Sequence, residues 1–355
     1  MKKKAYRVLF GGLGVLILVG LAATTYTYII KKLNLYTEAV TAYRAGNYTS
    51  AYKIWATLAE NGNAAAQYNL GIMYSKGEGV DLNLSEAARW FTLAANQGFI
   101  QAQYNLGVMY EQGQGVSVNK VESLKWFTQA ATKGDLKSQY NLGIFYFTGR
   151  DVPQDYQAAY KWFLLAADQG YAEAQYNLGV LLDQNLGVDQ NPSEAKKWYL
   201  AAGEQGHVKA QHNLAHMYYL GREGMPPDSE QAIKWYKKAA EQGEFQSQYN
   251  LGQIYLNGKG VEKDPKEAKK WYLRAAAQGT HQAQNNLGVM YEQGDGVTKD
   301  IIRAHMWYSI AVANGSKDAV TPHEHYAKKL SPDQLAQAAD MVQKCVSSHY
   351  ADCGE

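Results

Sequence analysis

The chain has 355 residues and a formal net charge of +2, a length that ordinarily corresponds to two or three compact domains. Past residue 32 it carries 29 basic and 33 acidic side chains, so its body has a slight negative excess. Nucleic-acid binding needs clustered Lys and Arg side chains that displace counterions from phosphates. The charge balance therefore argues against a nucleic-acid partner.

The chain begins with a basic tail at residues 1–7, followed by an uninterrupted apolar stretch at residues 8–30. A helix of this length can cross a hydrocarbon core of about 30 Å. The six positive charges before residue 33 are not offset by any acid, and four of them precede the apolar stretch. By the positive-inside rule, the sequence predicts a single transmembrane signal anchor, with the N-terminus in the cytoplasm and the rest of the chain across the membrane.

A cleaved signal peptide is the competing interpretation of this leader. Its apolar region would run from Val8 to Leu21, with Gly20 and Ala22 as small residues before the cut. The apolar run continues through Ile30, which favours an uncleaved anchor. In both interpretations the body of the chain is exported.

Tryptophan marks an internal repeat throughout the rest of the chain. The eight tryptophans are separated by 35 to 37 residues: Trp55, Trp90, Trp126, Trp162, Trp198, Trp235, Trp271 and Trp307. So large a side chain recurs at such spacing when each copy fills an equivalent hole in a stack of equivalent units. The sequence predicts an all-α fold in which helix-turn-helix repeats form one α/α solenoid.

The first helix of each repeat carries Leu-Gly-x-x-Tyr or a near variant, beginning with Leu70 and Gly71. Ala66, Leu70 and Met73 fall at helical spacing and form its buried stripe. A glycine inside a helix costs about 1 kcal/mol relative to alanine. Its recurrence predicts that a neighbouring backbone approaches too closely for a methyl group.

The second helix of each repeat has a recurring start and end. An Asn or Asp seven residues before each tryptophan is expected to cap the helix: Asn83, Asn119, Asp155, Asn191, Asp228, Asp264 and Asp300. A glycine eight residues after each tryptophan, such as Gly98, is expected to end the helix in a left-handed conformation. Between the helices, Gly-x-Gly predicts a turn. A phosphate-binding loop is set aside because it needs a preceding strand and a following Lys with Ser or Thr.

The two ends of the chain depart from the repeat. Residues 31–63 contain a linker and a degenerate unit around Trp55, and residues 316–355 contain a further helix opened by Ser331 and a tail. Solenoids need end units with a polar outer face, so both segments are expected to be caps. Cys345 and Cys353 are disulfide candidates if the body is exported, and two unpaired thiols are the alternative.

A column of side chains on the far side of each first helix is the candidate binding surface. Tyr68 and Ile72 lie about 160° from Leu70 on a helical projection and should not belong to the core of their own unit. Tyrosine offers contact area, low entropy loss and a hydroxyl. The alternative is that the column packs between neighbouring first helices. The predicted column is Tyr68, Ile72, Tyr104, Val108, Tyr140, Ile144, Tyr176, Val180, His212, His216, Tyr249 and Gln253.

The fifth repeat replaces both column residues with histidine, His212 and His216, one helical turn apart. Two histidines at this spacing can share a metal, but no glutamate follows His212 as a zinc protease requires, and no acidic ligand is obvious nearby. A polar contact of the binding surface is the favoured interpretation. We expect no metal, cofactor-binding or catalytic residues.

The repeat motif resembles the Sel1-like repeat family. The sequence Ala-x-Ala-Gln-Tyr-Asn-Leu-Gly-x-Met-Tyr, the Gly-x-Gly-Val turn, the Asp cap and Ala-x-x-Trp-Tyr carry the resemblance, and residues 64–315 match it as seven repeats. Tetratricopeptide repeats share Leu-Gly-x-x-Tyr but place tryptophan three residues before that leucine. In this chain that position is glutamine, from Gln67 to Gln284.

The resemblance implies a right-handed α/α superhelix that acts as a scaffold for protein assemblies, with the first helices on its concave side. The closing segment, with Trp307 and then Ser331 and Pro332, resembles the ending of bacterial members. Together with the leader, it points to a membrane-anchored bacterial protein, with a single pass through the inner membrane and repeats in the periplasm.

The sequence therefore predicts a non-enzymatic scaffold of the cell envelope that binds a protein partner through the concave column. Two alternatives stay open. One is an inhibitor or immunity-type protein that neutralises a single toxin or enzyme, and the other is an envelope hydrolase acting on cell-wall or β-lactam substrates. No serine, histidine and acid arrangement stands out from the repeat pattern to support the hydrolase.

Overall fold

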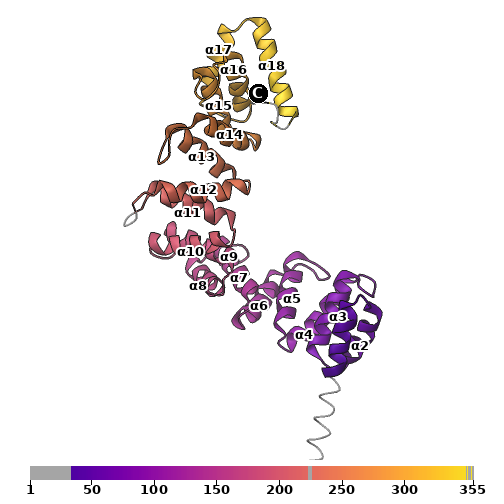
Figure 1. Ribbon diagram of the computed structural model, residues 1–355. Helices are drawn as coiled ribbons and strands as arrows, with labels where there is room; N and C mark the ends of the chain where they lie inside the picture. The colour runs from indigo at the N-terminus through magenta and orange to yellow at the C-terminus, as the bar shows by residue number, and fades with distance from the viewer. Residues whose placement is uncertain (1–32, 223–225, 349, 351–352, 354–355) are drawn as a thin grey trace, which may run out of the picture. The chain divides into compact units, whose positions relative to one another are not determined.

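The computed structural model describes residues 33–222, 226–348, 350 and 353, and the secondary structure of this part of the chain is helical (Figure 1). The transmembrane helix predicted at residues 8–30 lies outside the described residues. Within the described ranges, no helix combines the length and apolar character needed to cross a bilayer. The chain divides into two compact units, Met1–Leu165 and Ala166–Glu355, and each is considered by itself below.

The described part of the first unit opens with a helix at residues 33–44 and continues with six labelled helices before α8, which spans the boundary between the units. The second helix of each repeat packs on the first helix of the same repeat and of the next. The helices are α2 (Tyr48–Glu60), α3 (Ala64–Lys76), α4 (Leu84–Asn96), α5 (Ile100–Gln112), α6 (Lys120–Thr132), α7 (Leu136–Thr148) and α8 (Tyr156–Asp168).

The second unit repeats the same pairing and ends with two further helices that pack on α16. Its helices are α9 (Ala172–Asp183), α10 (Pro192–Glu204), α11 (Val208–Leu220), α12 (Ser229–Glu241), α13 (Phe245–Asn257), α14 (Pro265–Ala277), α15 (His281–Gln293), α16 (Ile301–Ala313), α17 (Val320–Lys329) and α18 (Pro332–Ser347).

The predicted starts and ends of the second helices are confirmed. Each of the seven Asn or Asp side chains accepts a hydrogen bond from the backbone N–H three residues later, as Asn83 does from Glu86 at 3.0 Å. Each glycine eight residues after a tryptophan has a positive φ, which for Gly98 is 85°. These interactions satisfy backbone groups that a helix end leaves unpaired.

The recurring glycine of the first helix meets an aromatic ring, so the predicted close backbone approach is wrong. A Cβ atom added at Gly71 would lie 2.5 Å from Cε1 of Phe91, on the second helix of the same repeat. Gly179 has the same relation to the Tyr199 ring, at 2.7 Å. The ring is the residue that follows tryptophan, and it needs the space of the missing methyl group. The six rings in this arrangement are Phe91, Phe127, Phe163, Tyr199, Tyr272 and Tyr308.

The tryptophans are less equivalent than their spacing suggests. Six of the eight are buried, but Trp162 and Trp198 are only partly buried. The ring that follows them is more uniformly buried, since Phe163 and Tyr199 are both 0 % exposed. The position after tryptophan therefore forms the constant core of the repeat.

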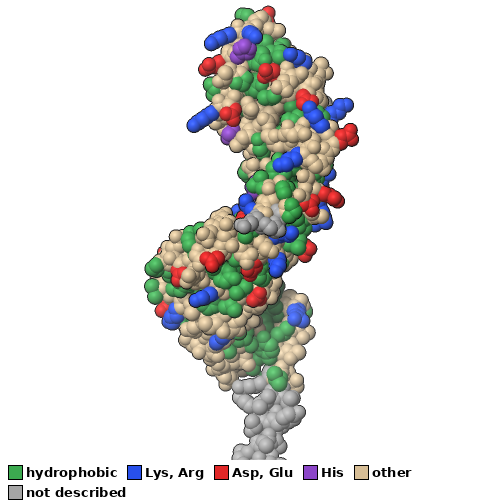
Figure 2. Space-filling model, turned by 90° about the vertical axis from the view of Figure 1, so that its left-hand side faces the viewer, with side chains coloured by type: hydrophobic (Ala, Val, Ile, Leu, Met, Phe, Trp, Pro, Cys, Tyr) green, Lys and Arg blue, Asp and Glu red, His purple; other side chains and the backbone are tan. Residues whose placement is uncertain are grey.

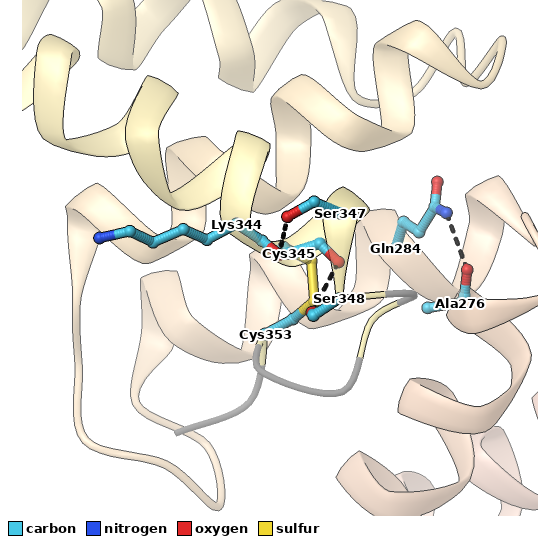
Figure 3. Close-up of a disulfide and its surroundings, with 7 residues drawn as sticks. All are labelled: Ala276, Gln284, Lys344, Cys345, Ser347, Ser348 and Cys353. Carbon is cyan, nitrogen blue, oxygen red and sulfur yellow. Dashed lines mark hydrogen bonds between the residues drawn. A yellow bond between two sulfur atoms is a disulfide. The ribbon is translucent and has the colours of Figure 1, made fainter.

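A buried glutamine joins each repeat to the preceding second helix. Gln284 is 0 % exposed, and its Nε2 donates to the carbonyl oxygen of Ala276 at 3.0 Å (Figure 3). Its Oε1 accepts from Nδ2 of Asn314 at 3.0 Å, within the same repeat. The bond to the preceding helix recurs at 2.9–3.1 Å in all seven repeats, through Gln67, Gln103, Gln139, Gln175, Gln211, Gln248 and Gln284.

The C-terminal helices cover α16 with polar and aromatic side chains. Two residues of α17, His323 and Tyr326, stack on His305 and Tyr308 of α16, with ring centroids 4.6 and 6.4 Å apart. α18 begins with a capping box at Ser331, and its other end is tied by a disulfide between Cys345 and Cys353, whose Cα atoms are 4.8 Å apart (Figure 3).

The contact between glycine and ring predicts unequal effects of two Gly→Ala substitutions in the fourth repeat. Gly179→Ala should lower the free energy of unfolding by about 1–3 kcal/mol, because the new methyl group overpacks the buried Tyr199 ring. Gly203→Ala is the comparison, since its Cβ would lie 3.3 Å from Cγ of Gln211 and 3.4 Å from the Trp235 ring, against 2.7 Å from the ring at Gly179. It should lower stability by less than Gly179→Ala does, because the contacts are looser and alanine favours a helix over glycine by about 1 kcal/mol.

Urea denaturation of the full chain, followed by circular dichroism, measures both effects. Equal effects of the two substitutions would contradict the steric role assigned to the ring.

Candidate functional site

The predicted column has two rows, of which the second lies four residues after the first in each repeat. The first row is Tyr68, Tyr104, Tyr140, Tyr176, His212 and Tyr249. These first-row residues are half-buried in both units. In the first unit, the Tyr68, Tyr104 and Tyr140 rings lie 5.7–5.9 Å, centroid to centroid, from the rings that follow tryptophan in the same repeats. In the second unit, the Tyr176 and Tyr249 rings lie 6.1 and 6.0 Å from the equivalent rings. One edge of each column ring therefore contacts the core of its own repeat, contrary to the sequence expectation, and the rest is partly accessible.

The column also contacts the next repeat. The Tyr68 ring lies 5.0 Å from the Phe99 ring, and the Tyr176 ring stacks on His207 at 4.6 Å; Phe99 and His207 each precede the first helix of the following repeat. Burial raises the pKa of Tyr68, and hydrogen bonding to Asn105 opposes the increase. Packing between neighbouring first helices, the alternative considered for the column, is thus part of its role.

The second row of the column differs in accessibility along the chain. Ile72, Val108, Ile144, His216 and Gln253 are half-buried, whereas Val180 is only 9 % exposed. Gln253 donates a hydrogen bond from Nε2 to the hydroxyl of Tyr249 at 2.8 Å, within its own helix. Val180 therefore offers little surface to a partner, whereas the other residues of the second row stay partly accessible.

The histidines of the fifth repeat have partners within the protein. Nδ1 of His212 lies 2.8 Å from Oγ of Ser247 and 3.2 Å from Oε2 of Glu244. Nδ1 of His216 lies 3.2 Å from the hydroxyl of Tyr236. The two imidazole rings are nearly parallel, with centroids 6.3 Å apart.

Glu244 is the acidic neighbour that the sequence did not reveal. It precedes α13 and caps that helix, accepting from the backbone N–H of Ser247. Burial tends to raise the pKa of this carboxyl, but the hydrogen bonds from His212 and Ser247 outweigh it and lower the pKa to about 2. Like Phe99 and His207, Glu244 directly precedes the first helix of the following repeat. Residues at this position contact the column of the repeat before them, so the position of Glu244 in the sequence could have identified it.

The cluster lacks the geometry of a hydrolase triad. Ser247 and Glu244 contact the same nitrogen of His212, whereas a triad needs the nucleophile on one ring nitrogen and the acid on the other. Ser247 is also 0 % exposed. Over the described part of the chain, no group of three His, Cys, Asp or Glu side chains is placed to hold a metal ion.

Basic and acidic side chains are interspersed on the face of the molecule that Figure 2 shows. Among the described residues, Lys125 pairs with Glu122 at 2.9 Å and Lys270 with Glu267 at 2.8 Å, and each pair lies within one helix.

These features define a class of helical repeat proteins in which each repeat is two helices joined by a Gly-rich turn. The Sel1 repeat family model matches seven consecutive segments: residues 64–99, 100–135, 136–171, 172–207, 208–244, 245–280 and 281–316. The chain belongs to the Sel1 repeat family. No enzymatic family is indicated. No curated protein matches the sequence.

The chain is also similar to proteins of solved structure, and the first of these agrees with the assignment. A Sel1 repeat protein from Oxalobacter formigenes is 35 % identical, and the match covers 68 % of this chain and 96 % of that chain with a TM-score of 0.57. A protective antigen of uropathogenic Escherichia coli with the same repeat fold is 30 % identical, covering 91 % and 85 %, with a TM-score of 0.44. An immunity protein from Pseudomonas aeruginosa is 20 % identical, covering 63 % and 83 %, with a TM-score of 0.35.

Proposed function

We propose that this protein is a non-catalytic scaffold of the bacterial cell envelope that binds a protein partner through the column on its first helices. The repeats would form a right-handed superhelix with the first helices on its concave side, anchored in the inner membrane by residues 8–30. Sel1 repeats typically mediate binding between proteins, which supports the general class of this function.

The half-buried aromatic side chains of the column carry the proposal. Tyr104 and Tyr140 occupy the same position of consecutive repeats, each fixed on one edge by a buried phenylalanine ring. A ring held in this way loses little conformational entropy on binding, and its accessible part offers both apolar area and a hydroxyl. Such residues are typical energetic centres of protein interfaces.

Site-specific photo-crosslinking tests the column. The full chain, with benzoylphenylalanine in place of Tyr104 or Tyr140, should give a crosslinked product with a partner protein in cells of the source organism, because the probe replaces one half-buried ring by another. Leu93 on α4 is the matched control, since it is an apolar side chain, 39 % exposed, on a second helix. The control position should give no such product.

Products from Leu93 equal to those from the column, or no product from either tyrosine, would contradict the proposal. If the crosslinked partner were a single, tightly bound toxin or enzyme that this protein neutralises, the result would instead support an inhibitor or immunity-type function. Several partners of lower affinity are the outcome expected of an assembly scaffold.

The envelope location requires a separate test. Alkaline phosphatase is active only outside the cytoplasm, so its fusion to residue 355 of the full chain should be active if residues 8–30 place the repeats across the membrane. The fused chain should also remain in the membrane fraction. If the phosphatase fusion were inactive and a β-galactosidase fusion at the same position were active, the repeats would lie in the cytoplasm. That result would contradict the proposed topology.

A further inference from the structure

The helix α17 is attached to the last repeat by a small contact. It follows α16, the second helix of the seventh repeat, and packs on it as the first helix of each repeat packs on the second helix before it (Figure 1). None of the ten residues of α17 is fully buried, and its N-cap residue, Ala319, has no side chain that could cap the helix. An element that buries so little area is among the first parts of a protein to open.

Two pairs of stacked rings hold α17 on α16. The Tyr308 and Tyr326 rings are parallel to within 2°, and both hydroxyls bond to the Glu292 carboxylate of α15. The His305 and His323 imidazoles lie closer together, with centroids 4.6 Å apart and planes inclined by 14°. His305 is 6 % exposed, and its buried Nδ1 has no hydrogen-bond partner among the described residues. The attachment of α17 therefore depends on two titratable rings in face-to-face contact.

The imidazole pair stands where two other repeats place a cation on an aromatic ring. His305 lies two residues before tryptophan, and at the equivalent position Nζ of Lys269 is 5.6 Å from the centre of the Tyr291 ring in the next repeat. Lys196 makes the same contact with Tyr218 at 4.8 Å. One positive charge suits this position, because a cation is attracted to the face of a neutral ring. Two positive charges on stacked rings repel each other, and water screens them little where one ring is buried.

The charged side chains around the imidazole pair do not neutralise it. Burial lowers the pKa of His305, and the neighbouring His323 lowers it further. In the described part of the chain, neither imidazole forms an ion pair with a carboxylate. Glu292, the acid nearest this contact in α15, bonds to the tyrosine hydroxyls instead. The other charged or titratable side chains of the surrounding helices and turn are His281 of α15, Arg303 of α16, Lys317 and Asp318 before α17, Glu324, His325, Lys328 and Lys329 of α17, and Asp333, Asp340 and Lys344 of α18.

We propose that α17 is an acid-sensitive element of the fold, which leaves α16 when both His305 and His323 carry a proton. Release would expose the ring of Tyr308, now 0 % exposed, and the face of α16 that α17 covers. The inference involves none of the column residues and stands independently of the proposed function.

The direction of the pH dependence follows from the protons that each state binds. A free imidazole has a pKa of about 6.5, so the released helix takes up a proton on each ring below that pH. The attached helix disfavours the second proton and binds fewer. Attachment is therefore fully present above about pH 6.5 and weakens as the pH falls below it.

Hydrogen–deuterium exchange of the full chain in a non-ionic detergent, followed by mass spectrometry, tests the proposal. Exchange rates at about pH 7.5 and about pH 5 are divided by the intrinsic rates of the same peptides, so that they report the opening of each helix. Protection of α17 should fall by about tenfold at the lower pH, which corresponds to a difference of about one pKa unit between the attached and released states. Protection of α14 in the same chain should change much less.

Two substitutions on α17 separate the stacked imidazole from an exposed one. His323→Gln removes one ring of the pair and should reduce the pH effect on α17 to about threefold or less. His325→Gln is the matched control, because His325 is exposed and contacts the edge of the Tyr326 ring. It should keep the tenfold effect. If α17 is unprotected in His323→Gln even at the higher pH, His305→Phe replaces it, since this variant keeps a stacked ring that cannot take up a proton.

Three results would overturn the proposal. The first is a protection of α17 that does not depend on pH, and the second is an equal loss of protection in α14, which would indicate general destabilisation. The third is the same pH dependence in the variant that lacks the imidazole pair as in His325→Gln.

Discussion

The hydrogen bond of the buried glutamine at the fourth position of each repeat is the interaction that joins that repeat to the helix before it. Its amide donates to the last turn of the preceding second helix, where the carbonyl oxygen also accepts a backbone N–H: that of Ala276 accepts from Gly279 at 2.9 Å as well as from Gln284. The glutamine fixes the position of one repeat on the next because a hydrogen bond tolerates little change in distance or angle.

The other recurring contacts lie within a single repeat. The ring after tryptophan fills the space beside a glycine and joins the two helices of one repeat. The same ring supports one edge of the column, as Phe127 does for Tyr104. The core of each repeat therefore orients the side chains that we propose for partner binding, and a half-buried column follows from the packing itself.

The sequence predicted the elements whose signal is local. The tryptophan spacing gave the repeat, and the Asn and Asp caps located the second helices, because capping depends on a few adjacent residues. Contacts between distant residues were harder to predict. The ring beside Gly71 and the carboxyl of Glu244 beside His212 arise from the packing of separate helices, which a helical projection of one helix does not contain. In the column, the projection did not reveal that the rings contact the core of their own repeats.

The role of the glutamine is tested most directly by comparing Gln284→Leu with Gln282→Leu in the full chain by urea denaturation. Both residues lie on α15, but Gln284 is 0 % exposed with two hydrogen bonds, and Gln282 is exposed. Gln284→Leu should lower the free energy of unfolding by about 1–3 kcal/mol, and Gln282→Leu should change it by no more than about 0.5 kcal/mol. Equal stability of the two variants would contradict the account.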